Sequence, residues 1–552
     1  LEYLDLETVP YATMSLLNLY EFAYQHNEKI LNNLPKPSHF KYNTKMILGN
    51  NAIFQLNVLS NNDVEFSKSK YKSLFNVVNN NVTSIGKRFL KDTLVAPLLD
   101  VDELNKRYSS IDFLLKNNKY ESLRDIMKNI HDIERLHRKI AIKMIHPHEF
   151  YEFVQSYKYV QKIIDNLKKS KTLQHILPDN KICAQVKDFI KLIEKQYIDD
   201  ELSKYKINEI ENSFFKKGIN KEIDKIQQEI DICIALMNNV CGVLSTYVDD
   251  VGKAKYIKKK KDITVEIAND EEYKIKLDRN NKEGYFLSLT KLRAKSLKKN
   301  IKDKTVIEIT DKYNIQTKNL IFKELDKGNT KIFFDELNKR SDTLIEMREK
   351  MRCICKEKYV ELLGEYQKDY GFMFRKMSEL IGKVDFLASA AKTAHLYGYN
   401  KPEIILDKDK GFVKCTKLRH PIIERINQDT EYIPHDIYLG QDPTDDTDNI
   451  NGMLVFGINS CGKSSLMKAI GLSVIMAQAG MFVPAENYSF SPYESLFARI
   501  TGNDNIFKGL SSFALEMTEL KAILRRAGPK IMVIGDEVCT GTEHISGNAS
   551  IP

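Results

Sequence analysis

The sequence has no pair of cysteines at the C-x-x-C spacing of metal ligands, although its 552 residues include eight cysteines. Scattered thiols are typical of free cysteines in a reducing compartment, and a disulfide or zinc framework is the less favoured interpretation. No apolar run reaches the roughly 18–20 residues that cross a bilayer, and the first residues carry no signal-peptide block. These absences predict an intracellular protein with no membrane partner. They leave open whether it is located in the cytoplasm or nucleoid, the nucleus or a mitochondrion, or is encoded by a virus.

Other absences concern the two ends and the charge. The sequence starts at Leu1 without a methionine and stops at Pro552 directly after a motif, so we expect an internal piece of a longer protein. Internal repeats and low-complexity segments are missing. Basic residues exceed acidic ones by only 84 to 75, which is compatible with a nucleic-acid partner but is not evidence for one. The length and the 42% hydrophobic content predict a globular chain of about three or four domains.

The residue pattern changes along the chain. Few glycines and apolar positions three to four residues apart predict helices from 45 to about 200 and again after 334, with Thr83 as a candidate N-cap. We expect residues 187–240 to form one charged helical arm, broken only at Gly218, with a compact globule as the less favoured alternative. Short apolar runs such as "ITVEI", "YKIKL", "GYFLSL", "TVIEIT" and "TKIFF" predict a small β module that interrupts the helices. Strands and helices then alternate, as in an α/β nucleotide-binding domain.

The stretch "GINSCGKSS" fits the phosphate-binding pattern G-x-x-x-x-G-K-[ST]. The apolar residues "MLVF" at 453–456 predict a strand before it, and a helix is expected from Lys463, which is the context that the pattern requires. Backbone N–H groups would surround the phosphates, Lys463 would neutralise their charge, and the Ser464 hydroxyl would ligate Mg²⁺. A chance glycine loop is the competing interpretation. The candidate nucleotide-binding residues are Gly457, Asn459, Ser460, Cys461, Gly462, Lys463, Ser464 and Ser465.

A pair of acidic residues follows in "KIMVIGDEVCTGTE". The apolar residues at 531–534 predict a buried strand, and Asp536 and Glu537 stand at its C-terminal end. This position suits Asp536 as a magnesium ligand and Glu537 as the residue that polarises the attacking water, with an ordinary acidic turn as the alternative. Together with the phosphate loop, the pair predicts an ATPase that uses ATP and Mg²⁺, with Glu537 and Lys463 as catalytic residues.

Several motifs, in order, resemble the MutS family of DNA mismatch-repair ATPases. The ATPase motifs are "RHPIIE" at 419–424, "GINSCGKSS" followed by "AGMFVPA", "GLSSFALEM" at 509–517 and "DEVCTGT" at 536–542. In the helical half, "VTSIGKRFL", "DIERLHRKI" and "VDFLASAAKTA" are similar to the lever segments of that family. The resemblance extends from about residue 40 to residue 552.

The resemblance implies a mixed fold. A long α-helical lever would carry a small β-rich clamp insertion and lead into an α/β P-loop ATPase domain of the ABC type. The implied boundaries are 1–40 for the end of a connector domain, 41–255 and 335–398 for the lever, 256–334 for the clamp, and 399–552 for a C-terminally incomplete ATPase domain.

The resemblance also implies residue roles. Tyr432 falls where the family places an aromatic ring against adenine. Ser511, with Ser512, would complete the nucleotide site of a partner subunit in a homodimer or heterodimer of MutS-like chains, whereas the residues alone equally suit a helix N-cap. Basic residues of the β module would contact DNA phosphates, although a lysine run is more often a solvated face. They are Lys258, Lys259, Lys260, Lys291, Arg293, Lys295, Lys298 and Lys299.

The implied function is an ATP-dependent clamp on double-stranded DNA that recognises mismatched or otherwise aberrant sites and signals to downstream repair factors. One alternative is a MutS-like binder of DNA structures in recombination control that does not read mismatches. Another is a structural ATPase of chromosome architecture, which predicts an LSGGQ-like signature that the sequence lacks. In the phosphate loop, Ile458, Ser460 and Cys461 replace the usual proline, methionine and glycine. These departures are typical of a divergent subgroup and bear on the rate of hydrolysis.

Overall fold

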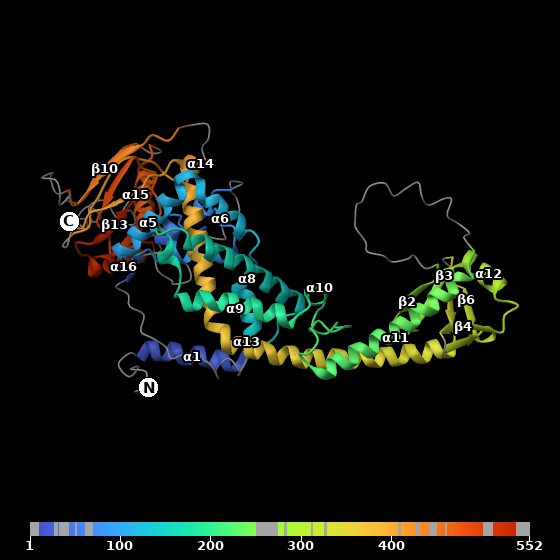
Figure 1. The fold of residues 1–552 in the computed structure, drawn as a ribbon. Helices are drawn as coiled ribbons and strands as arrows, with labels where there is room; N and C mark the ends of the chain where they lie inside the picture. The colour runs from blue at the N-terminus through green and yellow to red at the C-terminus, as the bar shows by residue number, and fades with distance from the viewer. Residues whose placement is uncertain are drawn as a thin grey trace. The chain divides into compact units, whose positions relative to one another are not determined.

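The computed structural model divides the chain into two compact units (Figure 1). The first comprises Leu1–Asn80, Leu90–Asn117 and Ser389–Pro552, and the second comprises Asn81–Phe89 and Asn118–Ala388. The structure describes residues 10–26, 31, 44–49, 52–60, 70–249, 274–280, 284–310, 313–324, 328–406, 410–426, 431–440, 450–458, 461–500 and 512–536.

Helices dominate the second unit. The longest, α13 (Asp335–Tyr397), runs for 63 residues and contributes to both units, as does α4 (Ser84–Val95). Figure 1 shows α11 alongside the first part of α13, and the thiol of Cys233 in α11 contacts the carbonyl of Arg340 in α13. The second unit also contains α6 (Lys119–Met127), α7 (Ile133–Ala141), α8 (Pro147–Lys168), η5 (Gln174–Ile176), α9 (Asn180–Gln196), α10 (Asp199–Leu202), α11 (Lys221–Thr246), α12 (Lys291–Asn300) and η6 (Thr317–Asn319).

An aromatic core holds these helices together. Phe153 and Tyr157 of α8, Phe189 of α9 and Phe374 of α13 are each fully buried. The ring centroids of Phe153 and Phe189 both lie 5.1 Å from that of Phe374, in edge-to-face geometry. Such pairs contribute about 0.5–1.5 kcal/mol beyond the area they bury. The spacing of three to four residues between buried rings in α8 is what the helical pattern predicted.

The predicted single arm over 187–240 is wrong. α9 ends at Gln196. The short helix α10 and a series of turns follow before Asn220 caps α11 by accepting hydrogen bonds from two backbone N–H groups. The reason is the burial of aromatic side chains, because Tyr197, Phe214 and Phe215 fold into the core at 3% exposure or less. A continuous solvated helix would leave these rings in water, which costs more free energy than breaking the helix.

By length and composition, α11 is long and apolar enough to cross a membrane, and it is the one helix among the described residues with this property. Its apolar positions Ile230, Met237 and Leu244 are nevertheless buried within the protein. Composition alone is therefore weak evidence for a membrane span.

The predicted β module is present in the second unit as two antiparallel sheets. One has the strand order β2-β3-β7-β6, and the other pairs β4 with β5. The runs "GYFLSL", "TVIEIT" and "TKIFF" fall on strands and "YKIKL" overlaps one, whereas "ITVEI" lies outside the described residues. The strands are β2 (Lys276–Asn280), β3 (Gly284–Thr290), β4 (Val306–Thr310), β5 (Tyr313–Gln316), β6 (Ile321–Glu324) and β7 (Asn329–Phe333).

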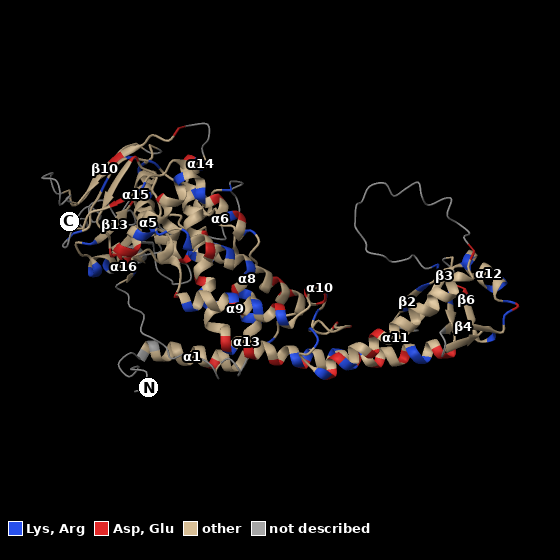
Figure 2. Cartoon of the chain, viewed as in Figure 1, with Lys and Arg blue, Asp and Glu red and all other residues tan. Residues whose placement is uncertain are grey.

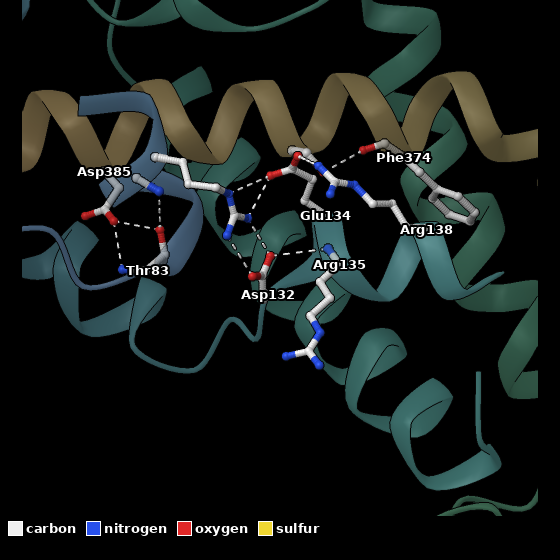
Figure 3. A network of polar contacts seen from close by, with 10 residues as sticks. Thr83, Asp132, Glu134, Arg135, Arg138, Phe374 and Asp385 are labelled. Atoms are coloured by element: carbon white, nitrogen blue, oxygen red, sulfur yellow. Dashed lines mark hydrogen bonds and ion pairs between the residues drawn. The ribbon is translucent and has the colours of Figure 1, made fainter. Parts of the chain in front are cut away.

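A buried carboxylate fixes the start of α4 (Figure 3). Thr83 is the N-cap, as predicted, because its hydroxyl accepts a hydrogen bond from the N–H of Gly86 at 2.9 Å. The same hydroxyl and the Thr83 N–H donate to Asp385 of α13 at 2.7 and 2.8 Å, and the Val82 N–H donates at 3.1 Å. Burial raises the pKa of Asp385, although these hydrogen bonds oppose the shift. A Cβ added at Gly86 would stand 2.1 Å from the Asp385 carboxylate, so glycine is required there.

Arg88 makes the second half of this network through Asp132 and Glu134, which are labelled in Figure 3. Its guanidinium donates to Asp132 at 2.7 Å and to Glu134 at 2.7 Å. Hydrogen bonding to Asp132 raises the pKa of Arg88. Glu134 also forms an ion pair with Arg138 at 2.6 Å. Within "TSIGKR", Thr83 caps α4, Gly86 leaves room for the Asp385 carboxylate of α13, and Arg88 forms ion pairs with the start of α7. These contacts hold α4 against α7 and α13.

The first unit contains two sheets. The parallel sheet has the order β1-β12-β13, and the mixed sheet has the order β10-β9-β11-β8. α15 packs on the parallel sheet, because a Cβ added at Gly471 would lie 2.7 Å from Ile534 of β13. The elements are α1 (Pro10–His26), β1 (Ile47–Gly49), α2 (Ala52–Gln55), α3 (Leu74–Val78), α5 (Val101–Leu115), η4 (Lys116–Asn118), β8 (Glu403–Ile404), β9 (Val413–Leu418), α14 (Ile423–Ile426), β10 (His435–Leu439), α15 (Lys463–Gln478), β11 (Asn487–Phe490), β12 (Ser495–Arg499), α16 (Ser512–Arg526) and β13 (Ile531–Gly535).

The predicted strand at 453–456 is not formed. The backbone there pairs with no described strand, and the side chains of Leu454 and Phe456 are 90% exposed. A cavity of about 380 Å³ lies between this segment and β13, lined by Met453 and Val455 on one side and Val533 on the other. An apolar run becomes a strand only where its backbone finds a hydrogen-bonding partner, and here the cavity separates it from the nearest strand.

Candidate nucleotide site

The phosphate loop enters α15 through a glycine in the left-handed conformation. Gly462 has φ +99° and precedes Lys463, the first residue of α15. This conformation is readily available only to glycine. The first turn of a helix leaves backbone N–H groups unpaired within the helix, and these form a binding place for anions. The helix predicted from Lys463 is confirmed, whereas Asn459 and Ser460 lie outside the described residues.

Lys463 folds back over the loop. Its ammonium group donates to the carbonyl of Gly457 at 2.7 Å and to that of Ile458 at 3.1 Å. The positive charge therefore stands inside the loop, where the phosphates of a nucleotide would compete with these carbonyls. A charged phosphate oxygen accepts a stronger hydrogen bond than a neutral carbonyl.

Ser464 and Asp536 meet across the site. The hydroxyl of Ser464, in the first turn of α15, donates to the carboxylate of Asp536, which directly follows β13. A hydroxyl and a carboxylate are the oxygen ligands that Mg²⁺ takes beside phosphates, with water filling the other positions. The two residues thus fit a magnesium site, and no larger cluster of metal-ligating side chains occurs within the described part of the chain.

A cavity of about 300 Å³ adjoins the first turns of α15. One side is apolar and comes mainly from the isoleucines of α14, and the other is polar. Ser464 and Ser465 both line it, so it opens beside the phosphate loop. Its lining residues are Asn57, Tyr71, Lys72, His420, Ile422, Ile423, Ile426, Ser464, Ser465 and Lys468.

His420 and Lys468 are among the residues of this cavity that received no role from the sequence. His420 belongs to "RHPIIE", and its Nδ1 accepts hydrogen bonds from the N–H groups of Ile422 and Ile423 at 3.1 and 3.2 Å. Nδ1 is therefore unprotonated, and burial lowers the pKa of His420 to about 4. Lys468 donates to the side-chain oxygen of Asn57 at 2.9 Å, and burial lowers its pKa also. The contact of Lys468 could not be predicted from the sequence, because Asn57 is 411 positions away.

Tyr432 stands next to this cavity. Its ring lies 6.3 Å from that of His420 in edge-to-face geometry, and its side chain is half-buried. An aromatic ring at this place offers a face for a base, with His420 behind it. The adenine role of Tyr432 remains a prediction.

The other predicted ATPase residues are described only in part. Ser511 and Glu537 lie outside the described residues, and α16 begins at Ser512, whose side chain also lies outside them. Cys461 is exposed in the loop, and its sulfur would stand 2.9 Å from a Cβ added at Gly457.

The basic residues of the β module gather on α12, which begins after the N-cap Thr290. Ala294 and Leu297 face the interior, whereas Lys295, Lys298 and Lys299 are exposed. Figure 2 shows acidic and basic residues mixed along α11 and α13, while α12 is basic. Two other predicted residues already have partners within the protein: Arg293 donates to the carbonyl of Lys274 at 3.1 Å, and Lys291 pairs with Glu324 at 3.9 Å. Lys258, Lys259 and Lys260 lie outside the described residues.

Comparison with known proteins settles the family. A family model described as MutS domain III matches residues 51–391, and one described as MutS domain V matches residues 453–551. The chain belongs to the MutS family. The resemblance read from the motifs is therefore confirmed.

Relatives within this family come from several sources. The chain is 37% identical to a candidate DNA mismatch repair protein, a mutS homolog, of Acanthamoeba polyphaga mimivirus, over 100% of the chain and 51% of that protein. It is 30% identical to the mitochondrial DNA mismatch repair protein mutS homolog of Sarcophyton glaucum, over 97% and 50%. It is 27% identical to the DNA mismatch repair protein MutS of Petrotoga mobilis, over 93% and 55%. The chain thus spans about half the length of the curated relatives it matches.

Proposed function

We propose that this MutS-family chain is the lever, clamp and ATPase portion of an ATP-dependent clamp on double-stranded DNA, which recognises mismatched or otherwise aberrant sites and signals repair. The observation that carries the proposal is the contact between Ser464 and Asp536, which joins the phosphate loop to the acidic end of β13. The matches to MutS domains III and V support a chain that combines these two parts of the family.

In the proposed mechanism, the N–H groups at the start of α15 and the ammonium group of Lys463 bind the phosphates of ATP. Mg²⁺, held by Ser464 and Asp536, would neutralise the charge that develops on the transferred phosphoryl group. Glu537 orients the attacking water. The cavity beside Ser465, with His420 and Tyr432 at its edge, would take the nucleoside.

The remaining parts of the proposal concern partners. Two MutS-like chains would dimerise, with Ser511 and Ser512 completing the partner's nucleotide site. The exposed lysines of α12 would contact DNA phosphates without reading sequence. ATP binding and hydrolysis would switch the lever between a scanning and a sliding state, and the sliding state would engage downstream repair factors.

The test is binding of the full-length protein to homoduplex, mismatched and branched DNA, with and without ATP. We expect tightest binding to mismatched DNA and ATP-dependent release along the duplex. Preference for branched over mismatched DNA would instead support a binder of DNA structures in recombination control. Glu537→Ala should bind ATP as the wild type does but hydrolyse it slowly, and loss of ATP binding in this variant would give Glu537 a structural role.

A further inference from the structure

Arg499 lies at the meeting point of the phosphate site and α16. It is the last residue of β12, the central strand of the parallel sheet, and every residue of that strand is buried. β12 pairs with β13 in register, with Arg499 opposite Gly535. A residue at the carboxyl end of a central parallel strand stands at the edge where ligands bind in such sheets.

The backbone of Arg499 is bonded to the candidate magnesium ligand. Its carbonyl accepts a hydrogen bond from the N–H of Asp536 at 2.7 Å. The carboxylate of Asp536 in turn receives the hydroxyl of Ser464. A displacement of Asp536 therefore acts on β12 through a single hydrogen bond.

The side chain of Arg499 reaches in another direction, to α16. Its Nε lies 3.2 Å from Oε2 of Glu519, and the two side chains are 9% and 18% exposed. The two atoms form an ion pair. Removing one member of a buried pair leaves the other charge uncompensated in a poorly solvated place.

The described side chains of α16 include both polar and apolar contacts. Among its described side chains, Ile523 is the one that is buried, and Leu524 is 72% exposed. Specific polar contacts help to fix the orientation of a helix on the surface of a sheet. The pair with Arg499 is such a contact.

We propose that Arg499 is a positioning residue that holds α16 through Glu519 and so couples the magnesium-ligand end of β13 to the helix that begins at Ser512. The inference rests on the proposed function, in which the start of α16 completes the nucleotide site of a partner subunit. Arg499 and Glu519 touch neither nucleotide nor magnesium in this scheme. They set the place of α16, and the pair transmits movement of Asp536 to the partner's site.

The test uses full-length protein in its assembled form, with Glu519→Gln, Arg499→Gln and the charge swap Arg499→Glu/Glu519→Arg. Each single variant should lower kcat for ATP about tenfold while the affinity for ATP changes less than about twofold, and the swap should recover most of the loss. The control is Lys521→Gln, which removes an exposed charge from the same helix and should leave kcat unchanged. Equal loss of ATP affinity and kcat, or a swap no better than the singles, would overturn the proposal.

Mixed dimers separate this inference from the proposed function. In one subunit Lys463→Ala disables the nucleotide site, so that turnover comes from the other subunit alone. Glu519→Gln should lower turnover when placed in the disabled subunit, and should not when placed in the active one. The reverse pattern overturns the positioning role. If the wild-type protein itself hydrolyses no ATP, the proposed function fails instead.

Discussion

The hydroxyl of Ser464 donates a hydrogen bond to the carboxylate of Asp536, a residue 72 positions further along the chain. The sequence assigned both residues to magnesium, and the fold brings them into contact because α15 packs directly on β13. Gly471 permits that packing, since a side chain there would clash with Ile534. The candidate ATP site thus depends on a helix–strand contact two turns away from its ligands.

Lys463→Ala should abolish ATP turnover. The substitution removes the ammonium group that stands over the carbonyls of Gly457 and Ile458, and the phosphates lose their lysine counter-charge. We expect kcat/KM to fall at least about a hundredfold, measured by phosphate release from the full-length protein. Lys521→Gln serves as the control. Unchanged turnover in Lys463→Ala would place the nucleotide elsewhere.

Features that depend on near neighbours could be predicted from the sequence. Thr83 as an N-cap, the start of α15 at Lys463 and the existence of a strand before Asp536 each follow from a few consecutive residues, although Val533 of that strand is exposed rather than buried. Helix capping and strand formation of this kind are local, and the pattern of side chains carries them.

Features that depend on distant partners could not be predicted. The helical arm breaks because Tyr197 and Phe215 find a core made by other helices. The apolar residues at 453–456 predict a strand, but their backbone forms no ladder with a described strand. His420 and Lys468 join the cavity only because Asn57 and α14 lie beside α15 in the fold. The spacing of residues along the sequence does not indicate which distant segments will be in contact in the fold.

Gly86→Ala should destabilise the second unit by about 1–3 kcal/mol. The added methyl would lie 2.1 Å from a carboxylate oxygen of Asp385, and that carboxylate cannot move without losing its bonds to Thr83. Gly364→Ala is the matched control, because its methyl would meet only the end of the Lys143 side chain. In an open helix position this change should stabilise by up to about 1 kcal/mol. Urea unfolding gives the free energy of unfolding of both variants. Equal values would show that the Asp385 side chain moves aside without cost.

Acid should destabilise the first unit through His420. Burial lowers the pKa of His420 from 6.5 to about 4. Between these pH values His420 is therefore protonated in the unfolded chain and neutral in the folded one. The stabilising contribution is therefore complete above pH 6.5 and is lost as the pH falls toward 4, by about 3 kcal/mol in all. His420→Asn keeps an acceptor for the N–H groups of Ile422 and Ile423 but does not titrate. Chemical denaturation from pH 4 to 7 should show a steeper loss in the wild type, and parallel curves would mean that His420 protonates freely in the folded state.

Replacing Lys295, Lys298 and Lys299 of α12 by glutamine should weaken DNA binding and flatten its salt dependence. Each lysine that neutralises a phosphate releases counterions, so the slope of log affinity against log salt should fall by about 0.9 for every phosphate that the variant leaves unneutralised. The control replaces Lys181, Lys191 and Lys195 of α9, which are equally exposed in the same unit and change the net charge by the same amount. A fluorescence-anisotropy titration at several salt concentrations distinguishes the two sets. An equal decrease of slope in both would indicate a diffuse electrostatic effect, and an unchanged slope in the α12 variant would remove α12 from the DNA interface.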